Sequence, residues 1–317
     1  MFKFSREDKL LIVFFIIYFF LSWILTWTYF ITHLNHIPDN WQDRHEKLIE
    51  GVSRGSNQFR MISFWLAELV SKIFIQPIFV SYLIIRFFFT FLTFCVFHLF
   101  LMKWFNHEKA FLSVTFLAAI TPLTYLPFLQ ESDVILQFLF LIGLWLIREK
   151  KFFVLLFLMA IGTFAKETIV FLIPFYFLLY WRKDKKWKVI LESLILVVAW
   201  LLFFYITRHA IYEGNNSRLW QLPRNLEMIK YYFTYNPLTN HHLLYIPLFG
   251  LFWFLPFFRL KDKPTFFQVA ASFIIIFTIL NFLFGWPEET RIILPLAFLV
   301  IPSGIMALFP GTNIKHA

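Results

Sequence analysis

The feature that most constrains this chain is a series of long apolar runs, each separated from the next by a short polar or basic segment. Residues 10–31 form the first run and contain no charged side chain. About 20 apolar residues in a helix cross the roughly 30 Å hydrocarbon core of a bilayer. Lipid offers no hydrogen-bond partners, so a crossing backbone must bond within its own segment, as a helix does. The pattern predicts an all-α polytopic membrane protein.

Further spans are predicted wherever the apolar pattern repeats. They cover residues 78–102, 110–129, 134–147, 189–207, 243–258, 266–284 and 292–309. Only 15% of the 317 residues are charged, compared with about a quarter in soluble domains. We therefore expect one transmembrane domain over residues 1–317 and no soluble domain. The lone Cys95 lies in an apolar run, so no intrachain disulfide is expected.

Residues 152–181 are too long for one span and too charged at their centre. As a single helix they would measure about 45 Å, which requires a tilt beyond the usual limit of about 40°. They would also place Lys166 and Glu167 at mid-bilayer, where a charge costs at least about 2.5 kcal/mol. We therefore expect two short helices that turn at Lys166, Glu167 and Thr168.

The distribution of basic residues gives the orientation. With the turn at Lys166, the clusters within residues 103–109, 148–151, 182–188 and 259–263 all fall on one side. Cytoplasmic loops are enriched in Lys and Arg. This topology predicts about ten transmembrane helices with both termini in the cytoplasm. The formal charge of +10 is then an orientation signal, and no nucleic-acid partner is expected.

In this topology the unusual polar residues collect on the outer side. The first outer loop, residues 32–77, is long, and residues 61–74 show helical apolar spacing with Glu68 and Lys72 among them, which predicts an interfacial helix. The fourth outer loop covers residues 208–242. Ionisable groups at membrane depth usually face a cavity or a partner. We expect an outer polar pocket, the alternative being that the charges only pair with one another. The candidate residues are Arg60, Arg86, Glu131, Asp133, Lys166, Glu167, Glu289 and Arg291.

Two other patterns in the first loop carry less weight. Residues 51–55 fit the G-x-S-x-G pattern of serine hydrolases, but no strand-rich domain is present to support a nucleophile turn. His33 and His36, together with Asp39 and Asp43, have a spacing that would let ligands share a helical face. They are more simply explained as loop side chains near the interface, so no metal site is predicted.

Five short motifs follow one another along the chain. A long acidic first loop contains Asp43-Arg44-His45-Glu46, and Gln58-Phe59-Arg60 leads into the interfacial helix. Ser132-Asp133 opens a middle span, Lys166-Glu167-Thr168 marks the tip of the short helix pair, and Glu288-Glu289-Thr290-Arg291 precedes the last span. In this order and topology the chain resembles the GT-C superfamily of polytopic membrane glycosyltransferases, in particular its small bacterial members. The resemblance covers nearly the whole chain.

The resemblance implies a function and a place in the cell. Members of the superfamily transfer a sugar from a polyprenyl-phosphate carrier to an acceptor on the outer face. The expected partners are therefore membrane lipid, a polyprenyl-phosphate-linked sugar donor, and a glycan, lipid or protein acceptor. The expected location is the plasma (inner) membrane within the cell envelope, with a multi-pass chain whose active face points outward. Some members use a divalent cation and others do not, so the cofactor is left open.

The resemblance also implies roles for the outer residues. In an inverting transfer, a first-loop carboxylate, Asp43 or Asp39, would remove the proton of the acceptor hydroxyl. Fixed cations would stabilise the leaving phosphate, the candidates being Arg60, Arg86, Lys166 and Arg291. Carboxylates would orient these cations or bind sugar hydroxyls, the candidates being Glu131, Asp133, Glu167 and Glu289.

Two rival functions do not involve catalysis. One is a lipid-carrier flippase or transporter, a class that often shows internal repeats and broken helices near the midplane. No clear repeat relates the two halves of this sequence, and its polar groups favour one face. The other is a non-catalytic scaffold that binds polyprenyl lipid. A carboxylate-to-amide change should abolish the function of an enzyme while leaving lipid binding intact.

Overall fold

The computed structural model describes residues 6–33, 39–53, 56–125, 130–181, 183–210, 221–235, 248–285 and 289–310. Within these ranges the fold is all-α, and no strand is present. The helices up to the middle of the chain are α1 (Arg6–Thr32), α2 (Asp39–Ile49), α3 (Met61–Phe74), α4 (Ile78–Leu101), α5 (His107–Ile120) and α6 (Glu131–Arg148). They are followed by α7 (Phe152–Ala165), α8 (Leu172–Trp181), α9 (Lys186–Tyr205), α10 (Leu222–Tyr235), α12 (Thr265–Phe284) and α13 (Ala297–Leu308).

Five helical segments of the described chain are long and apolar enough to cross a membrane. They are Glu7–Thr32, Ile78–Leu101, Lys186–His209, Thr265–Phe284 and Thr290–Leu308. All five correspond closely to predicted spans. This confirms the all-α class and a chain with several candidate membrane spans.

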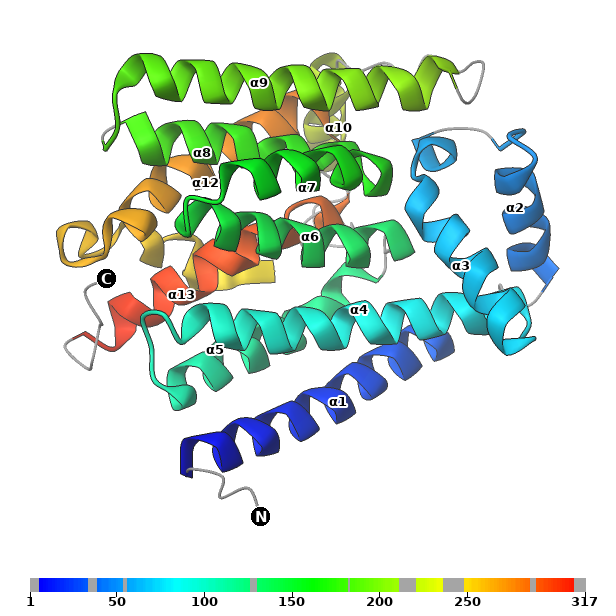
Figure 1. Ribbon diagram of the computed structural model, residues 1–317, viewed down its shortest axis with the longest axis horizontal. Coiled ribbons are helices and arrows are strands. Elements are labelled where there is room, and N and C mark those ends of the chain that lie inside the picture. The colour runs from blue at the N-terminus through cyan, green and yellow to red at the C-terminus, as the bar shows by residue number, and fades with distance from the viewer. Residues whose placement is uncertain are drawn as a thin grey trace.

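The long helices lie side by side along one axis of the molecule (Figure 1). The helices α2 and α3 of the first loop sit together at one end of the bundle, which we call the loop end. The helix α1 begins, and α13 ends, at the opposite end, which we call the basic end. At the basic end Lys103 lies 3.5 Å from Glu149, and the Lys109 ammonium donates to the Phe309 carbonyl over 3.5 Å.

Residues 152–181 form two short helices, as predicted. The helix α7 ends at Ala165, a 3-10 turn covers Glu167–Phe171, and α8 follows. The rings of Phe152 and Tyr176 are 6.1 Å apart, so α8 runs back along α7 and the pair is a hairpin. The absence of a Cβ at Gly162 permits this close return, since a Cβ there would lie 2.6 Å from the Ile169 side chain. Lys166 is therefore at the tip of a hairpin.

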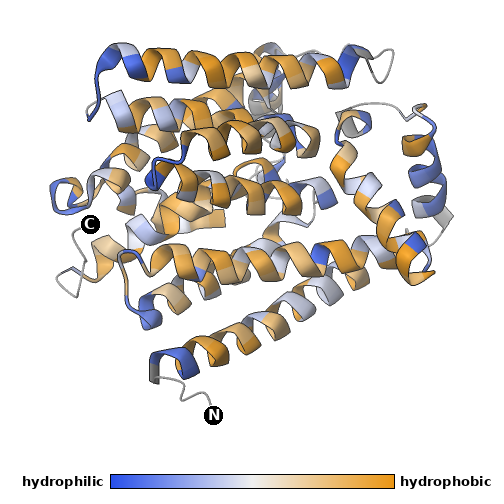
Figure 2. Cartoon of the chain, viewed as in Figure 1, coloured by the Kyte–Doolittle hydropathy of each residue, from blue (hydrophilic) through white to orange (hydrophobic). Residues whose placement is uncertain are grey.

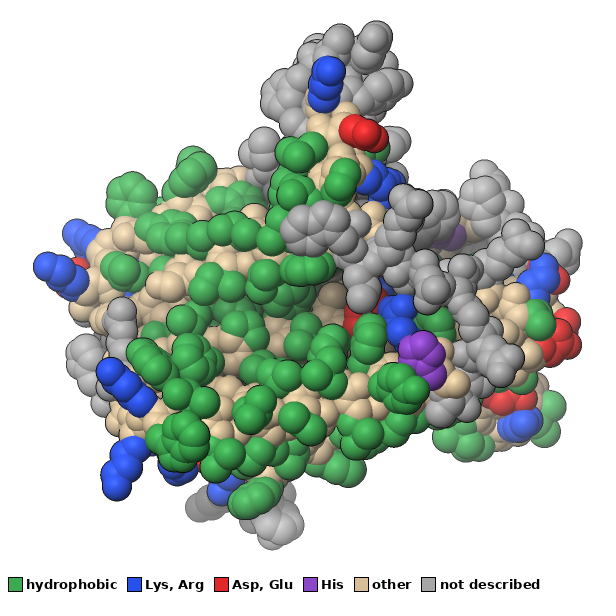
Figure 3. Space-filling view, turned by 90° about the horizontal axis from the view of Figure 1, so that it is seen from above, with side chains coloured by type: hydrophobic (Ala, Val, Ile, Leu, Met, Phe, Trp, Pro, Cys, Tyr) green, Lys and Arg blue, Asp and Glu red, His purple; other side chains and the backbone are tan. Residues whose placement is uncertain are grey.

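The surface shows an apolar flank between two polar ends. In Figure 2 the hydrophilic segments gather at the two ends of the bundle, and the long helices are mostly hydrophobic along their middle. Figure 3 shows hydrophobic side chains covering the flank that faces the viewer, with Lys and Arg at the basic end and mixed charges at the loop end. Exposed flank residues include Phe157, Val198 and Ile275. Such an apolar belt is what lipid contact requires.

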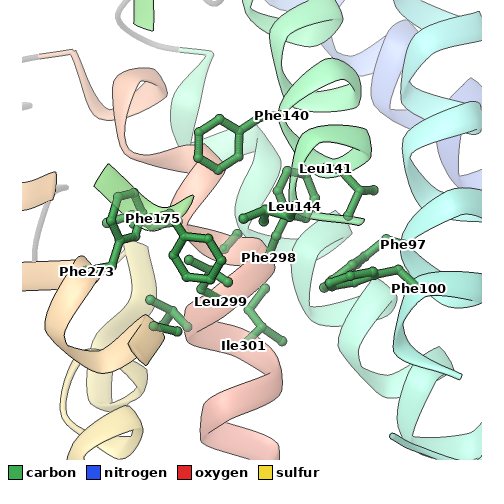
Figure 4. Close-up of a cluster of buried hydrophobic side chains, with 14 of the residues drawn as sticks. Phe97, Phe100, Phe140, Leu141, Leu144, Phe175, Phe273, Phe298, Leu299 and Ile301 are labelled. Atoms are coloured by element: carbon green, nitrogen blue, oxygen red, sulfur yellow. The ribbon is translucent and has the colours of Figure 1, made fainter. Parts of the chain in front are cut away.

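The interior is packed by aromatic and aliphatic side chains contributed by distant helices (Figure 4). The Phe97 and Phe298 rings meet edge to face at 5.1 Å, and Phe175 and Phe273 do so at 5.2 Å. Edge-to-face pairs of this kind contribute about 0.5–1.5 kcal/mol beyond burial. These contacts pack α4 against α13 and α8 against α12 within one core.

The structure differs from the predicted spans in several places. The α5 helix ends at Ile120, because Pro122 lies in the 3-10 turn that follows; residues 126–129 of that prediction lie outside the described residues. From Gly250 the predicted span 243–258 consists of short 3-10 turns around Pro256, and residues 243–247 are not described. The last span begins with 3-10 turns around Pro295 before α13 starts.

The two long loops that the sequence places on the outer side contain more helix than was predicted. The interfacial helix over residues 61–74 is present as α3. The helix α2 in the first loop and α10 in the fourth loop were not predicted. The Asn225 side chain fixes α10 by donating to the carbonyls of Phe282 and Gly285 at the end of α12.

Candidate functional site at the loop end

Asp133 is the centre of a buried ionic network at the loop end. It lies in the first turn of α6, where its side chain also accepts from the Gln130 backbone N–H at 2.9 Å in a capping box. One carboxylate oxygen is paired with Lys166 from the hairpin tip. The other accepts from the Arg291 guanidinium at 3.0 Å. Arg291 is also 2.8 Å from Glu289. One aspartate therefore joins α6, the α7–α8 hairpin and the start of the last segment.

Arg60 brings the first loop to the same network. Its guanidinium lies 3.1 Å from Glu167 and 2.5 Å from the Gln130 side chain. The Glu167 backbone carbonyl in turn accepts from the Trp200 indole at 3.1 Å. The loop between α2 and α3 is thus tied to α6, the hairpin tip and α9.

Arg86 and Glu131 form a separate buried pair beside the network. The two side chains are 2.9 Å apart and both are buried. The Arg86 guanidinium carbon also lies 3.4 Å from the centre of the Tyr29 ring on α1. A cation held between a carboxylate and an aromatic face satisfies the requirement that a buried charge be paired. This pair links α1, α4 and α6.

The charges of the network balance. Its cations are Lys166, Arg291 and Arg60, and its carboxylates are Asp133, Glu289 and Glu167. Each predicted phosphate-binding cation therefore already has a carboxylate partner. Pairing on this scale holds the elements together, and it leaves no surplus charge in the network for an anionic ligand.

The cations of the network lower the pKa values of two of its carboxylates, Asp133 and Glu167. Burial raises the pKa of Asp133, but Lys166, Arg291 and Arg60 outweigh it and hold that pKa well below its usual range. Burial also raises the pKa of Glu167, but Arg60 and Lys166 outweigh it and lower that pKa to about 2. Both groups are therefore ionised at neutral pH.

A cavity opens next to this network. It has an empty volume of about 410 Å³, counting the part open to solvent. It is formed between α2, the start of α3, α4 and the start of α6. The residues that line it are Trp41, Arg44, His45, Leu48, Arg60, Ser63, Tyr82, Gln130, Glu131 and Ser132. This set combines aromatic faces, hydroxyl and amide groups, cations and a carboxylate, as in pockets that orient a polar ligand.

Arg44 is the cation that distinguishes this cavity. It lines the cavity and is exposed, and it has no ion pair or hydrogen bond with any described residue. Arg60 and Glu131 also line the cavity, but each is engaged by a partner. Arg44 therefore supplies an unbalanced positive charge to the cavity, which favours an anionic ligand.

Of the two candidate bases, Asp43 is not brought to the described cavity. Asp43 is exposed and pairs with Lys47 at 2.6 Å, four residues along the same helix, and it does not line the cavity. The side chain of Asp39 lies outside the described residues. The prediction that one of them acts as a base stays a prediction.

The first-loop histidines do not form a described metal centre. His33 bonds to the Tyr29 carbonyl at 2.9 Å, and His36 lies outside the described residues. Among the residues that the structure describes, no three His, Cys, Asp or Glu side chains group in a way that would hold a metal ion.

Several cavity residues were not singled out from the sequence. Trp41, Arg44, His45 and Leu48 recur at the i, i+3, i+4, i+7 spacing of one helix face. That periodicity was the available signal, and the high charge of the segment obscured it. Tyr82 and Ser63 lie in apolar or neutral surroundings and carried no comparable signal.

Comparison with protein-family models, with curated proteins and with solved structures finds no match for this chain. The chemistry of the cavity and of the adjoining network therefore carries the functional inference.

Proposed function

We propose that this protein is a membrane glycosyltransferase of the GT-C type. It moves a sugar from a polyprenyl-phosphate carrier to an acceptor at the outer face of the plasma (inner) membrane. The observation that carries the proposal is the cavity beside the ionic network. In this cavity Arg44, which has no ion-pair partner among the described residues, lines the same space as Trp41 and a group of neutral polar side chains.

The cavity suits the two halves of a sugar phosphate. Aromatic rings such as Trp41 and Tyr82, whose centres are 5.4 Å apart, offer apolar faces to the C–H side of a sugar ring. Ser63, Gln130 and Ser132 offer hydrogen-bonding groups to its hydroxyls. Arg44 would take the phosphate, since a guanidinium can bind two phosphate oxygens at once.

The surroundings suit a lipid-linked donor. Beside the cavity, α3 exposes Trp65, Leu69 and Ile73, an apolar stripe suited to the membrane interface. Under the proposal about ten helices cross the bilayer, both ends of the chain are cytoplasmic, and the loop end faces outward. The polyprenyl tail then lies in lipid while the sugar phosphate reaches the cavity at headgroup depth.

The proposed reaction is an inverting displacement. The acceptor oxygen forms a bond to the anomeric carbon while the bond from that carbon to the phosphate oxygen breaks, and the electron pair leaves with the phosphate. Arg44 would stabilise the growing negative charge on the phosphate. The buried cations Arg60, Lys166 and Arg291 would shape this end of the cavity through their carboxylate partners.

The proton of the acceptor hydroxyl needs a base. Asp43 and Asp39 are the first-loop candidates from the sequence. To act as the base, Asp43 must give up its contact with Lys47 and approach the acceptor from the solvent side of α2.

Donor binding tests the proposal. The full-length protein in lipid nanodiscs is mixed with a panel of polyprenyl-phosphate hexoses, and native mass spectrometry measures the bound fraction. Hydrogen bonds to charged groups contribute about 1.5–3 kcal/mol, so Arg44→Gln should weaken binding by roughly 10–100-fold. Lys47→Gln is the matched control, because it removes a cation from the same helix outside the cavity.

The outcomes separate the proposal from its rivals. Binding of a sugar adduct, release of polyprenyl phosphate on addition of acceptor glycans, and dependence on Arg44 support the transferase. Binding of ordinary phospholipids alone refutes it. Binding without turnover identifies a scaffold, and movement of the intact adduct across a proteoliposome bilayer identifies a flippase.

A further inference from the structure

The second polar feature of the cavity is a chain of three hydrogen-bonded side chains from three helices. His45 on α2 is buried and lines the cavity. Its Nε2 is 2.9 Å from a carboxylate oxygen of Glu68 on α3. Its Nδ1 is 2.9 Å from the hydroxyl of Tyr82 on α4, and Tyr82 lines the same cavity. The ionic network and the proposed phosphate contact do not use these groups, and the proposed sugar contact uses the ring of Tyr82 but not its hydroxyl.

The donors and acceptors of this chain can be assigned. The hydrogen bond from Lys72, followed by that from His45, lowers the pKa of Glu68, so this carboxylate is ionised at neutral pH and can only accept. His45 Nε2 therefore carries a hydrogen. In a neutral imidazole the other nitrogen is then an acceptor, so the Tyr82 hydroxyl donates to His45 Nδ1. The Tyr82 oxygen keeps lone pairs that can accept from a ligand hydroxyl in the cavity.

We infer that Glu68, His45 and Tyr82 form a proton relay that serves a hydroxyl bound in the cavity. The inference rests on the proposed transferase function, and it names the group that accepts the proton of the acceptor hydroxyl during sugar transfer. In other enzymes a hydroxyl nucleophile is activated by a histidine base whose second nitrogen donates a hydrogen bond to a carboxylate. Tyr82 is the group that touches the acceptor, and His45 and Glu68 act through it.

The proton path is complete within these residues. As the acceptor oxygen bonds to the anomeric carbon, its proton passes to the Tyr82 oxygen, and the Tyr82 proton passes to His45 Nδ1. Glu68 stabilises the resulting imidazolium. The electron pair of the broken bond leaves on the phosphate. The relay returns to its starting state when His45 releases one proton to water after the product departs.

Charged groups from several elements surround His45. On its own helix Arg44 is adjacent, and Arg60 and Glu131 line the same cavity. From α3 it faces Glu68, which is itself 2.9 Å from Lys72. A protonated His45 cannot accept the Tyr82 proton, so turnover should fall on the acid side with a one-proton dependence.

Turnover in nanodiscs, measured as release of polyprenyl phosphate across a pH series, tests the relay. Positioned base catalysis contributes about 10²–10⁴-fold, so His45→Gln and Tyr82→Phe should each lower kcat by that factor. Both should bind the donor as the wild type does, and His45→Gln should lose the acid-side fall. Added imidazole should restore part of the activity of His45→Ala. His107→Gln, at the basic end of the bundle, is the matched control and should behave as the wild type.

The results distinguish the relay from the proposal on which it rests. If the wild type releases no polyprenyl phosphate from any donor, the transferase function itself fails. If the wild type is active, His45→Gln keeps both its rate and its acid-side fall, and Asp43→Asn abolishes turnover, the relay is refuted and the transferase stands. Loss of donor binding and of thermal stability in His45→Gln, with an unchanged pH profile, also refutes the relay and shows a purely structural clamp.

Discussion

Substitution of Asp133 by asparagine is the most direct test of the ionic network. The change keeps the size of the side chain and an oxygen that can accept from the Gln130 backbone in the capping box. It removes the negative charge that Lys166 and Arg291 share. Both cations are at most 5% exposed, so water cannot replace the lost partner.

The expected cost follows from this burial. Removing one partner of a buried ion pair costs about 3–5 kcal/mol, because an uncompensated charge stays buried. At about 2 °C per kcal/mol for a large domain, the unfolding midpoint should fall by roughly 6–10 °C. Asp43→Asn is the matched control, since it breaks an exposed i, i+4 pair with Lys47 that contributes about 0.3–0.5 kcal/mol.

The assay is the fraction of monodisperse protein in mild detergent after heating, measured by size-exclusion chromatography for the wild type and both variants. Adding Lys166→Met to Asp133→Asn removes one of the stranded cations and should recover part of the loss. A midpoint for Asp133→Asn within about 1 °C of Asp43→Asn would refute the reasoning, because it would show that the buried charges find other partners at little cost.

Three further predictions concern the hairpin, acid stability and topology. Gly162→Val places side-chain atoms against Ile169, where even a Cβ would lie at 2.6 Å. Such overpacking should lower the free energy of unfolding by about 1–3 kcal/mol, which the same heating assay measures. Glu167 has a pKa lowered to about 2, so its contribution is present above pH 4.5 and is lost as pH falls toward 2; Glu167→Gln should flatten that part of a stability–pH curve. In a cysteine-free background, an impermeant maleimide applied to intact cells should label Val52→Cys, and Lys183→Cys should react only after permeabilisation. The reverse labelling would overturn the proposed orientation.

The break in residues 152–181 was predictable because two independent constraints agreed. The segment is longer than a bilayer is thick, and Lys166 and Glu167 stand at its centre. Either a long tilted helix with buried charges or a hairpin had to result, and the hairpin places the charges at an end. The structure has that hairpin.

The pairing within the ionic network was not predictable. Asp133 and Arg291 are 158 residues apart, and Arg60 and Glu167 are 107 apart. Which cation meets which carboxylate depends on the rotation and depth of each helix, and apolar periodicity fixes neither to the precision of a hydrogen bond. The sequence therefore indicated the set of charged residues and their common end, without showing that they neutralise one another.

The helix α2 was missed because its core-facing side is narrow. Leu48 and His45 are buried there, while Gln42, Asp43, Glu46 and Lys47 are exposed. A segment with so much charge favours a loop when hydropathy is averaged along the chain. Only its helical period reveals the face that lines the cavity.

The two sides of the cavity differ in how they are held. On one side, α6 is fixed to the hairpin tip and to the last segment by Asp133, whose buried ionic contacts cannot be exchanged for water one at a time. On the other side, α2 is held by the hydrogen bonds of His45 to Glu68 and Tyr82, by the Gln58 side chain bonded to the Leu48 carbonyl, and by the buried Leu48. The cavity thus has one wall held by buried ion pairs and another held by separate hydrogen bonds, two of which come from His45.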